Sequence, residues 1–161
     1  MLTSLCVTVD RGHWKYLGLS SFCSLKYFET SVILQDSFPQ EDFPNMQPNI
    51  HAFEYMLDLI SEVPRGIEYL TVYLRLTGND YLNIISMGYN WNRFMTLAHS
   101  FQSVKMVDVI IISDSKEFGD IADECHRVLR SAFRPYLPQK KRIIRSSCHL
   151  GDYDRYIRDP D

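Results

Sequence analysis

The chain has 161 residues, of which 45% are hydrophobic and 23% charged, with only 7 glycines and 7 prolines. These proportions are those of an ordinary folded globular protein, and the length suits one domain with a sizeable core. The formal charge of −3 gives no overall attraction to nucleic acid or to an anionic membrane. Such binding would therefore need a local basic patch.

The four cysteines are far apart in the sequence and form no C-x-x-C pair. Cys6 lies in a strand-like apolar run and Cys125 on an apolar helix face, as reduced core cysteines do. This spacing argues against a zinc site and against a disulfide framework. The sequence also shows no signal peptide and no run of membrane-spanning length. We therefore expect an intracellular protein, cytoplasmic or nuclear, that is not bound to a membrane.

The first part of the chain has the pattern of three strands. Residues 2–10 alternate apolar and polar side chains, while 15–26 and 27–35 are rich in aromatic, β-branched and hydroxyl-bearing residues. Because no helical pattern separates these segments, we expect three consecutive antiparallel strands. Residues 36–48 carry three prolines and three acids, so we expect a loop there.

Helical and strand patterns alternate in the next part of the chain. An apolar stripe that follows a capping asparagine predicts a helix at 49–63. Alternating side chains predict the fourth strand at 67–76. A short helix is expected at 81–87 and a longer one at 91–104.

The strongest pattern lies at 106–133. The β-branched apolar run at 107–112 predicts a strand that is buried on both faces. Apolar residues spaced by three and four then predict a helix at 118–133, which we expect to pack through Ile121, Cys125, Val128 and Leu129. A strand followed by an amphipathic helix is a unit of an α/β domain.

The last part of the chain differs in composition. It holds one basic cluster, formed by Lys140, Lys141, Arg142 and Arg145, and then a stretch rich in aspartate. We therefore expect a domain at 1–138 and a basic, then acidic, tail at 139–161, loosely attached or disordered over 146–161. The basic cluster is either an electrostatic contact to nucleic-acid phosphates or a solvated charged segment.

The predicted order of elements, βββ-α-β-α-α-β-α, resembles the ribonuclease H-like fold over about residues 2–133. The resemblance implies a single α/β domain with a five-stranded mixed sheet, in which three antiparallel strands come first and helix-linked strands follow. It also implies that the strand at 67–76 lies beside the strand at 2–10 and runs parallel to it.

Members of that family hold divalent metal with carboxylates on the first strand, on the first helix, after the fourth strand and near the start of the last helix. This chain has an acid near each of these places, namely Asp10, Glu54, Asp80 and Asp123. The resemblance implies that these four are catalytic and bind Mg²⁺ or Mn²⁺ for phosphodiester cleavage. The motifs also depart from the family, because Arg11 displaces the glycine after the first acid and Thr77-Gly78 takes the usual place of the third acid.

Two functions are therefore open. The first is a metal-dependent nuclease of ribonuclease H-like type, or a nucleic-acid-binding relative of one, and the four acids favour it. The second is a catalytically inactive α/β module that acts through protein–protein interaction, with surface tyrosine and phenylalanine forming the interface. The acidic net charge and the departures from the family motifs favour this second function.

Overall fold

A computed structural model describes residues 2–9, 17–35, 50–77, 89–113, 118–133 and 143–150. These residues form a five-stranded sheet, three α-helices and a short 3-10 helix. In chain order the elements are β1 (Ser4–Val9), η2 (Leu19–Ser21), β2 (Tyr27–Gln35), α1 (Ile50–Ser61), β3 (Tyr69–Thr77), α3 (Trp91–Ser100), β4 (Met106–Ser113), α4 (Phe118–Phe133) and β5 (Ile143–Leu150).

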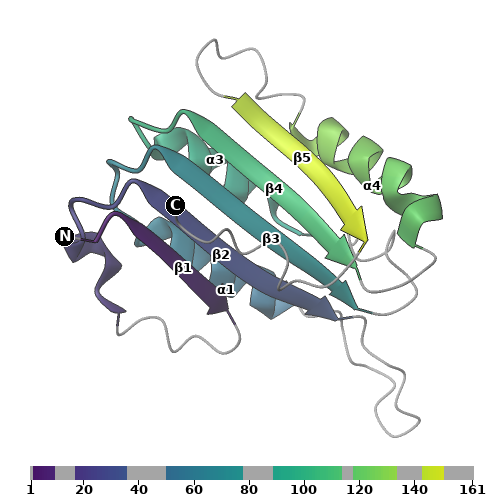
Figure 1. Cartoon of the computed structure of the whole chain (residues 1–161), viewed down its shortest axis with the longest axis horizontal. Helices are drawn as coiled ribbons and strands as arrows, with labels where there is room; N and C mark the ends of the chain where they lie inside the picture. The colour runs from purple at the N-terminus through teal and green to yellow at the C-terminus, as the bar shows by residue number, and fades with distance from the viewer. Residues whose placement is uncertain are drawn as a thin grey trace, which may run out of the picture.

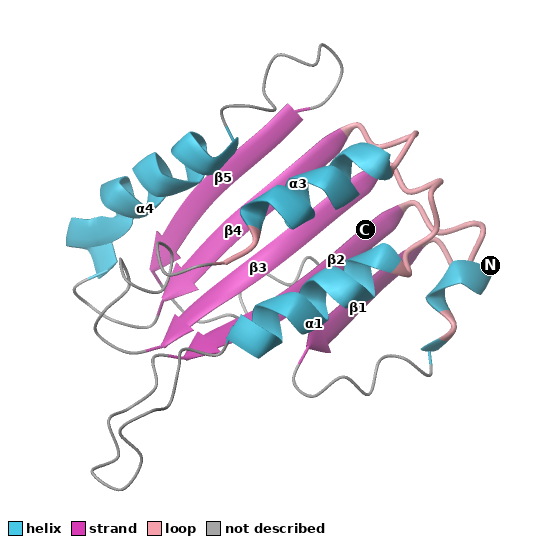
Figure 2. Ribbon diagram, turned by 180° about the vertical axis from the view of Figure 1, so that it is seen from behind, coloured by secondary structure: helices cyan, strands magenta, loops and turns pink. Residues whose placement is uncertain are grey.

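All neighbouring strands of the sheet are parallel, and their spatial order β1-β2-β3-β4-β5 is the same as their order in the chain. Right-handed crossovers that always step in one direction place their connections on the same face of a sheet. Accordingly, α1, α3 and α4 lie on one side of the sheet, and the other side carries no helix among the described residues (Figure 1, Figure 2). The fold is a singly wound β/α sheet.

The predicted ribonuclease H-like mixed sheet is wrong. β1 and β2 run parallel, with Ser4 opposite Tyr27, instead of antiparallel. β3 pairs with β2 and β4, so the strand predicted at 67–76 does not lie beside the first strand.

The segment at 15–26 explains this error. Its described part contains η2 instead of a strand, and η2 begins after Gly18, whose φ of 56° is in the left-handed region that glycine adopts without steric strain. Leu19 and Leu25 are buried, so this segment contributes to the core as a short crossover. Because it is a crossover, the strands on either side of it run in the same direction.

The other elements lie close to their expected positions. The helices predicted at 49–63, 91–104 and 118–133 are confirmed by α1, α3 and α4. β5 lies inside the predicted tail, so residues 143–150 belong to the sheet, and the expectation of a loosely attached segment at 146–161 does not hold for residues 146–150. The loop predicted at 36–48 and the short helix predicted at 81–87 lie outside the described residues.

The core lies between the sheet and the helices. Alternate residues of the central strands point into it and are buried, namely Phe28, Thr30, Val32 and Leu34 of β2, Leu70, Val72, Leu74 and Leu76 of β3, and Val107, Val109 and Ile111 of β4. Aromatic rings join the helices, because the ring of Trp91 lies 5.0 Å from that of Phe53 on α1 and 5.6 Å from that of Phe133 on α4. On α4, Cys125 and Leu129 are fully buried, as the sequence predicts.

Candidate binding face

The strand residues that alternate with the buried, inward-pointing ones lie on the opposite side of the sheet, which we call the helix-free face. Its side chains form rows across the strands. The first row holds Ser4, Tyr27, Tyr69 and Met106, the second Cys6, Glu29, Thr71 and Asp108, and the third Thr8, Ser31, Tyr73 and Ile110. This face mixes aromatic, polar and charged residues, in contrast to the almost wholly apolar inner face.

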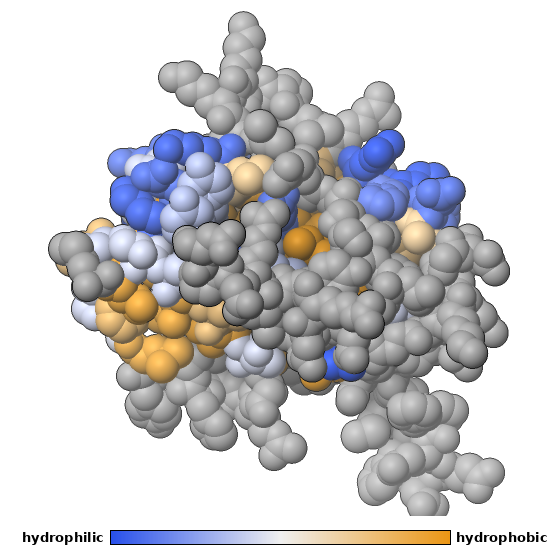
Figure 3. Space-filling view, in the orientation of Figure 1, coloured by the Kyte–Doolittle hydropathy of each residue, from blue (hydrophilic) through white to orange (hydrophobic). Residues whose placement is uncertain are grey.

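The accessible part of the helix-free face lies along β1 and β2. Ser4, Cys6 and Thr8 are small and exposed, and beside them Tyr27 is 47% and Ile33 36% exposed. Ser31 of β2 is buried, as are Tyr73 and Ile112 farther across the face. Seen from this side, hydrophilic atoms gather above a hydrophobic area at the left of the molecule, where β1 and the beginnings of the next strands lie (Figure 3).

The first row carries a stacked aromatic pair. The rings of Tyr27 and Tyr69 are 4.7 Å apart between centroids, and their planes differ by 5°. This distance follows from the strand spacing of ~4.8 Å, because the two residues are partners in register. The ammonium of Lys105, which immediately precedes β4 on the other side of β3, lies 5.9 Å from the centroid of Tyr69.

A row of charges stands next to this pair, one residue before β2, β3 and β4. The Lys26 Nζ lies 3.0 Å from the Glu68 Oε1, and Lys105 donates a hydrogen bond to the same carboxylate. The hydrogen bond from Lys105, followed by that from Lys26, lowers the pKa of Glu68 below its ordinary value of 4.5. The same bond to Glu68 raises the pKa of Lys105.

The backbone repeats its geometry at this edge of the sheet. The N–H groups of Glu68 and Tyr69 both donate to the carbonyl of Lys26. In the next unit, the N–H groups of Lys105 and Met106 both donate to the carbonyl of Glu68. β3 and β4 therefore enter the sheet in the same way.

Glu54 forms an ion pair between two helices. Arg93 on α3 donates from Nη1 to the Glu54 Oε2 at 2.5 Å and from Nη2 to the Asp58 Oδ1 at 2.5 Å. The hydrogen bond to Asp58 is the largest cause of the raised pKa of Arg93, and the bond to Glu54 adds to it. Glu54, which the resemblance predicted to be catalytic, thus joins α1 to α3 through its ion pair with Arg93.

The described residues bring no three-residue metal site together. Asp123 is exposed on α4, and α3 lies between α4 and the helix that carries Glu54 (Figure 2). Asp10 and Asp80 lie outside the described residues. The Mg²⁺ or Mn²⁺ site therefore stays a prediction.

The predicted nucleic-acid contacts are described only in part. Lys140, Lys141 and Arg142 lie outside the described residues. Arg145 is in β5, in register with Asp108, and only its backbone is described. A role for these four residues in binding phosphates also stays a prediction.

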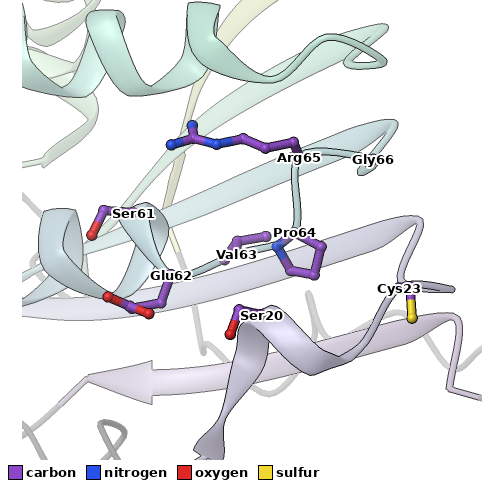
Figure 4. Close-up of a pocket in the computed structure, with 8 residues that line it drawn as sticks. All are labelled: Ser20, Cys23, Ser61, Glu62, Val63, Pro64, Arg65 and Gly66. Atoms are coloured by element: carbon purple, nitrogen blue, oxygen red, sulfur yellow. The ribbon is translucent and has the colours of Figure 1, made fainter.

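One pocket lies between η2 and the C-terminal end of α1 (Figure 4). It has a volume of about 400 Å³ and is lined by Ser20, Cys23 and the segment from Ser61 to Gly66. The Ser61 hydroxyl donates to the Asp58 carbonyl at 2.6 Å, and the Arg65 guanidinium reaches away to Ser100 and the Phe101 ring. The lining therefore offers no nucleophile paired with a base. Open α/β sheets bind ligands at the carboxyl ends of their strands, and this pocket lies at the opposite edge of the sheet.

The sequence predictions missed the row of Lys26, Glu68 and Lys105 and the tyrosine pair. A signal for them exists in the sequence, since the starts of β2, β3 and β4 each have a charged residue followed by two apolar or aromatic ones, namely K-Y-F, E-Y-L and K-M-V. The recurrence is hard to detect because few residue identities repeat and the intervals differ in length.

In the described part of the chain, no helix combines the length and the apolar character needed to span a membrane. No family model matches the chain, and no curated protein or solved structure matches it.

Proposed function

We propose that this chain is a catalytically inactive protein-binding module that uses the helix-free face along β1 and β2. The observation that carries the proposal is the placement of the three described α-helices on one side of a parallel sheet. Parallel sheets are usually covered on both faces. A partner protein would cover the accessible side chains on the side that the described helices leave open.

The distribution of exposed apolar side chains supports this proposal. Among the described residues, the exposed large hydrophobic side chains are Leu2, Leu17, Tyr27, Ile33 and Tyr55. Of these, Tyr27 and Ile33 lie on the helix-free face, whereas Leu17 lies in the crossover beside η2. Exposed apolar residues gathered in one region, with polar residues around them, are typical of interaction sites.

Repeat proteins supply a physical precedent. When each unit adds one strand and one helix in the same sense, the strands line a continuous surface on the side away from the helices, and such extended surfaces are used to bind partners. This chain shares with them the feature that α1, α3 and α4 all lie on one side of a parallel sheet.

Charge supports a protein partner over a nucleic acid. Lys26 and Lys105 both contact Glu68, so much of their charge is balanced locally. The next rows of the face alternate in sign, since Glu29 and Asp108 share the second row, Arg145 is in register with Asp108, and Arg75 follows in register with Ile33. The face therefore lacks the one-signed basic surface that suits a phosphate backbone.

Site-specific photo-crosslinking tests the proposal. A benzophenone amino acid in place of Ile33 samples the helix-free face, and the same group in place of Tyr55 samples the helix layer at matched exposure. In cells of the source organism, we expect a discrete crosslinked protein from position 33 and not from position 55. Crosslinking only from position 55, or equally from both, would contradict the proposal. Cleavage of an oligonucleotide that needs Mg²⁺ and is lost in Asp10→Asn would support the nuclease prediction instead.

A further inference from the structure

We propose that the outer edge of β1 binds an extended segment of a partner protein, which joins the sheet as a further strand parallel to β1. The segment would place apolar side chains toward the helix layer at alternate positions. The inference goes beyond the proposed function, because it concerns the main-chain groups along one edge of the sheet and not the side chains of the helix-free face. Addition of a strand to a sheet edge is a recurring mode of peptide recognition.

β1 lies at one edge of the sheet, and its outer side pairs with no other strand among the described residues (Figure 1). The carbonyl of Thr3 faces β2, where it accepts a hydrogen bond from the N–H of Tyr27. Because alternate residues of a parallel strand direct their N–H and C=O groups to opposite sides, Ser4 and Thr8 direct theirs away from β2. Main-chain groups that point outward along an edge are a template for another strand.

The sequence of β1 lacks the features that usually prevent such pairing. Edge strands are commonly blocked by charged side chains, by proline or by a β-bulge. The segment Ser4–Val9 reads S-L-C-V-T-V, with no charged residue and no proline, and its six residues pair with β2 in an unbroken register. None of these barriers therefore stands against a further strand at β1.

The starts of the strands indicate the direction of the added strand. The carbonyl of Thr3 accepts hydrogen bonds from the N–H groups of both Lys26 and Tyr27. The carbonyls of Lys26 and Glu68 each accept two in the same way from the next strand start, so one parallel step occurs three times in succession. At β1 the equivalent donors are the N–H groups of Thr3 and Ser4, and no described carbonyl accepts from them. A parallel strand would supply that carbonyl and repeat the step.

The helix layer is thinnest beside β1, and this indicates the side chains of the partner segment. The described part of the connection from β1 to β2 holds the three-residue η2, whereas the next connections hold helices of 12, 10 and 16 residues. Leu5 and Val7 of β1 and Phe22 beside η2 pack against the core but are only partly buried. The inward residues of β2 are fully buried. Apolar side chains at alternate positions of an added strand would cover Leu5 and Val7.

A second copy of the chain suits this edge less well. Its open edge among the described residues is β5, and stacking β5 on β1 would join copies head to tail without closing. No described helix follows β5, so that contact would add no helix over Leu5 and Val7. A partner segment with apolar residues of its own covers these side chains and ends the sheet after one added strand.

Peptide selection followed by N-methylation of the selected peptide tests the inference. A random peptide library is selected against the immobilised full chain, and the tightest-binding peptide becomes the probe. We expect apolar residues at alternate positions of the probe. An N-methyl group is then placed on each of its amides in turn, and binding should be lost at every second position, because alternate amides of a strand face the neighbouring strand. The probe should also slow hydrogen exchange of the Ser4 and Thr8 amides.

Ser4→Pro tests the same contact from the side of the chain. Proline has no N–H group, and it is tolerated at the first residue of an edge strand, so this substitution removes an outward donor and keeps the bonds to β2. It should weaken binding of the probe by roughly two- to tenfold, as expected for one backbone hydrogen bond. Ser4→Ala keeps the N–H group and is the matched control, with unchanged affinity. If Ser4→Pro does not fold, the N-methyl series still decides, since it leaves the chain unaltered.

The outcomes separate this inference from the proposed function. A selection that enriches no peptide, an N-methyl series without alternation, or unchanged affinity of folded Ser4→Pro overturns strand addition. If the probe instead loses affinity in Ile33→Ala, the helix-free face stands as a binding face and only the edge site fails. A nitroxide at the N-terminus of the probe should broaden the amide signal of Ser4 more than that of Val9, and the reverse overturns the parallel direction. Self-association of the chain in sedimentation that Ser4→Pro abolishes overturns the assignment to a separate partner.

Discussion

Replacing Leu129 by alanine tests how α4 is held on the sheet. Leu129 has no exposed surface and lies with Cys125 and Phe133 on the inner side of α4. Truncation of a fully buried leucine removes its transfer free energy and leaves a cavity, so the free energy of unfolding should fall by about 2–5 kcal/mol. Arg130→Ala, at an exposed neighbour on the same helix, should change it by less than about 0.5 kcal/mol.

The singly wound topology also predicts where this destabilisation acts. Among the described residues, β5 pairs with β4 alone and α4 contacts β5 and α3, so this unit has fewer neighbours there than the centre of the sheet. Urea unfolding followed by circular dichroism measures the total loss, and amide hydrogen exchange measures its distribution. We expect protection to fall first in α4 and β5, with β2 and β3 least affected. A loss below about 1 kcal/mol, or a uniform fall in protection, would refute this reasoning.

Three further predictions concern single groups. Because the pKa of Glu68 is lowered in the folded state, the stabilisation from its contacts with Lys26 and Lys105 is fully present above about pH 4.5 and is lost as the pH falls through the pKa of the folded state. Glu68→Gln should remove this part of the pH dependence of urea unfolding. Burial raises the pKa of Cys125 to about 11, so alkylation near pH 8, followed by peptide mass spectrometry, should modify the exposed Cys6 and Cys23 first and Cys125 only on unfolding. The buried Thr30 hydroxyl has no hydrogen-bond partner, so Thr30→Val should raise the free energy of unfolding by about 1 kcal/mol, and a fall of that size would show that this hydroxyl is bonded.

The strands and helices with clear periodicity could be predicted from the sequence, but their pairing could not. The apolar run of β4 and the helical stripe of α4 each depend on local spacing, and both lie where expected. The direction of β2 depends on whether the preceding connection crosses over the sheet. Residues 15–26 hide this crossover, because a short 3-10 turn around Leu19 has no period that a sequence can display.

The candidate site was missed for a related reason. Acids were placed by analogy with a family fold, and Glu54 then proved to be paired with Arg93, which is far from it in the sequence. The stack of Tyr27 on Tyr69 arises only from the register of two parallel strands. Register between strands joined by a long connection cannot be read from either strand alone.

The ion pairs of Arg93 allow a last prediction that separates a structural role of Glu54 from metal binding. Arg93, Glu54 and Asp58 are 37%, 33% and 40% exposed, so each pair should contribute only about 0.2–1 kcal/mol. Arg93→Met, which removes both pairs, should therefore lower the free energy of unfolding by up to about 2 kcal/mol, and Glu54→Gln by less because Asp58 keeps its partner. High salt should reduce both effects, since these charges are near the surface. The Arg93 guanidinium also opposes a second cation at Glu54, so we expect no saturable Mg²⁺-dependent NMR shift at that carboxylate. A saturable shift that Glu54→Gln abolishes, with stability unchanged, would instead assign Glu54 to a metal site.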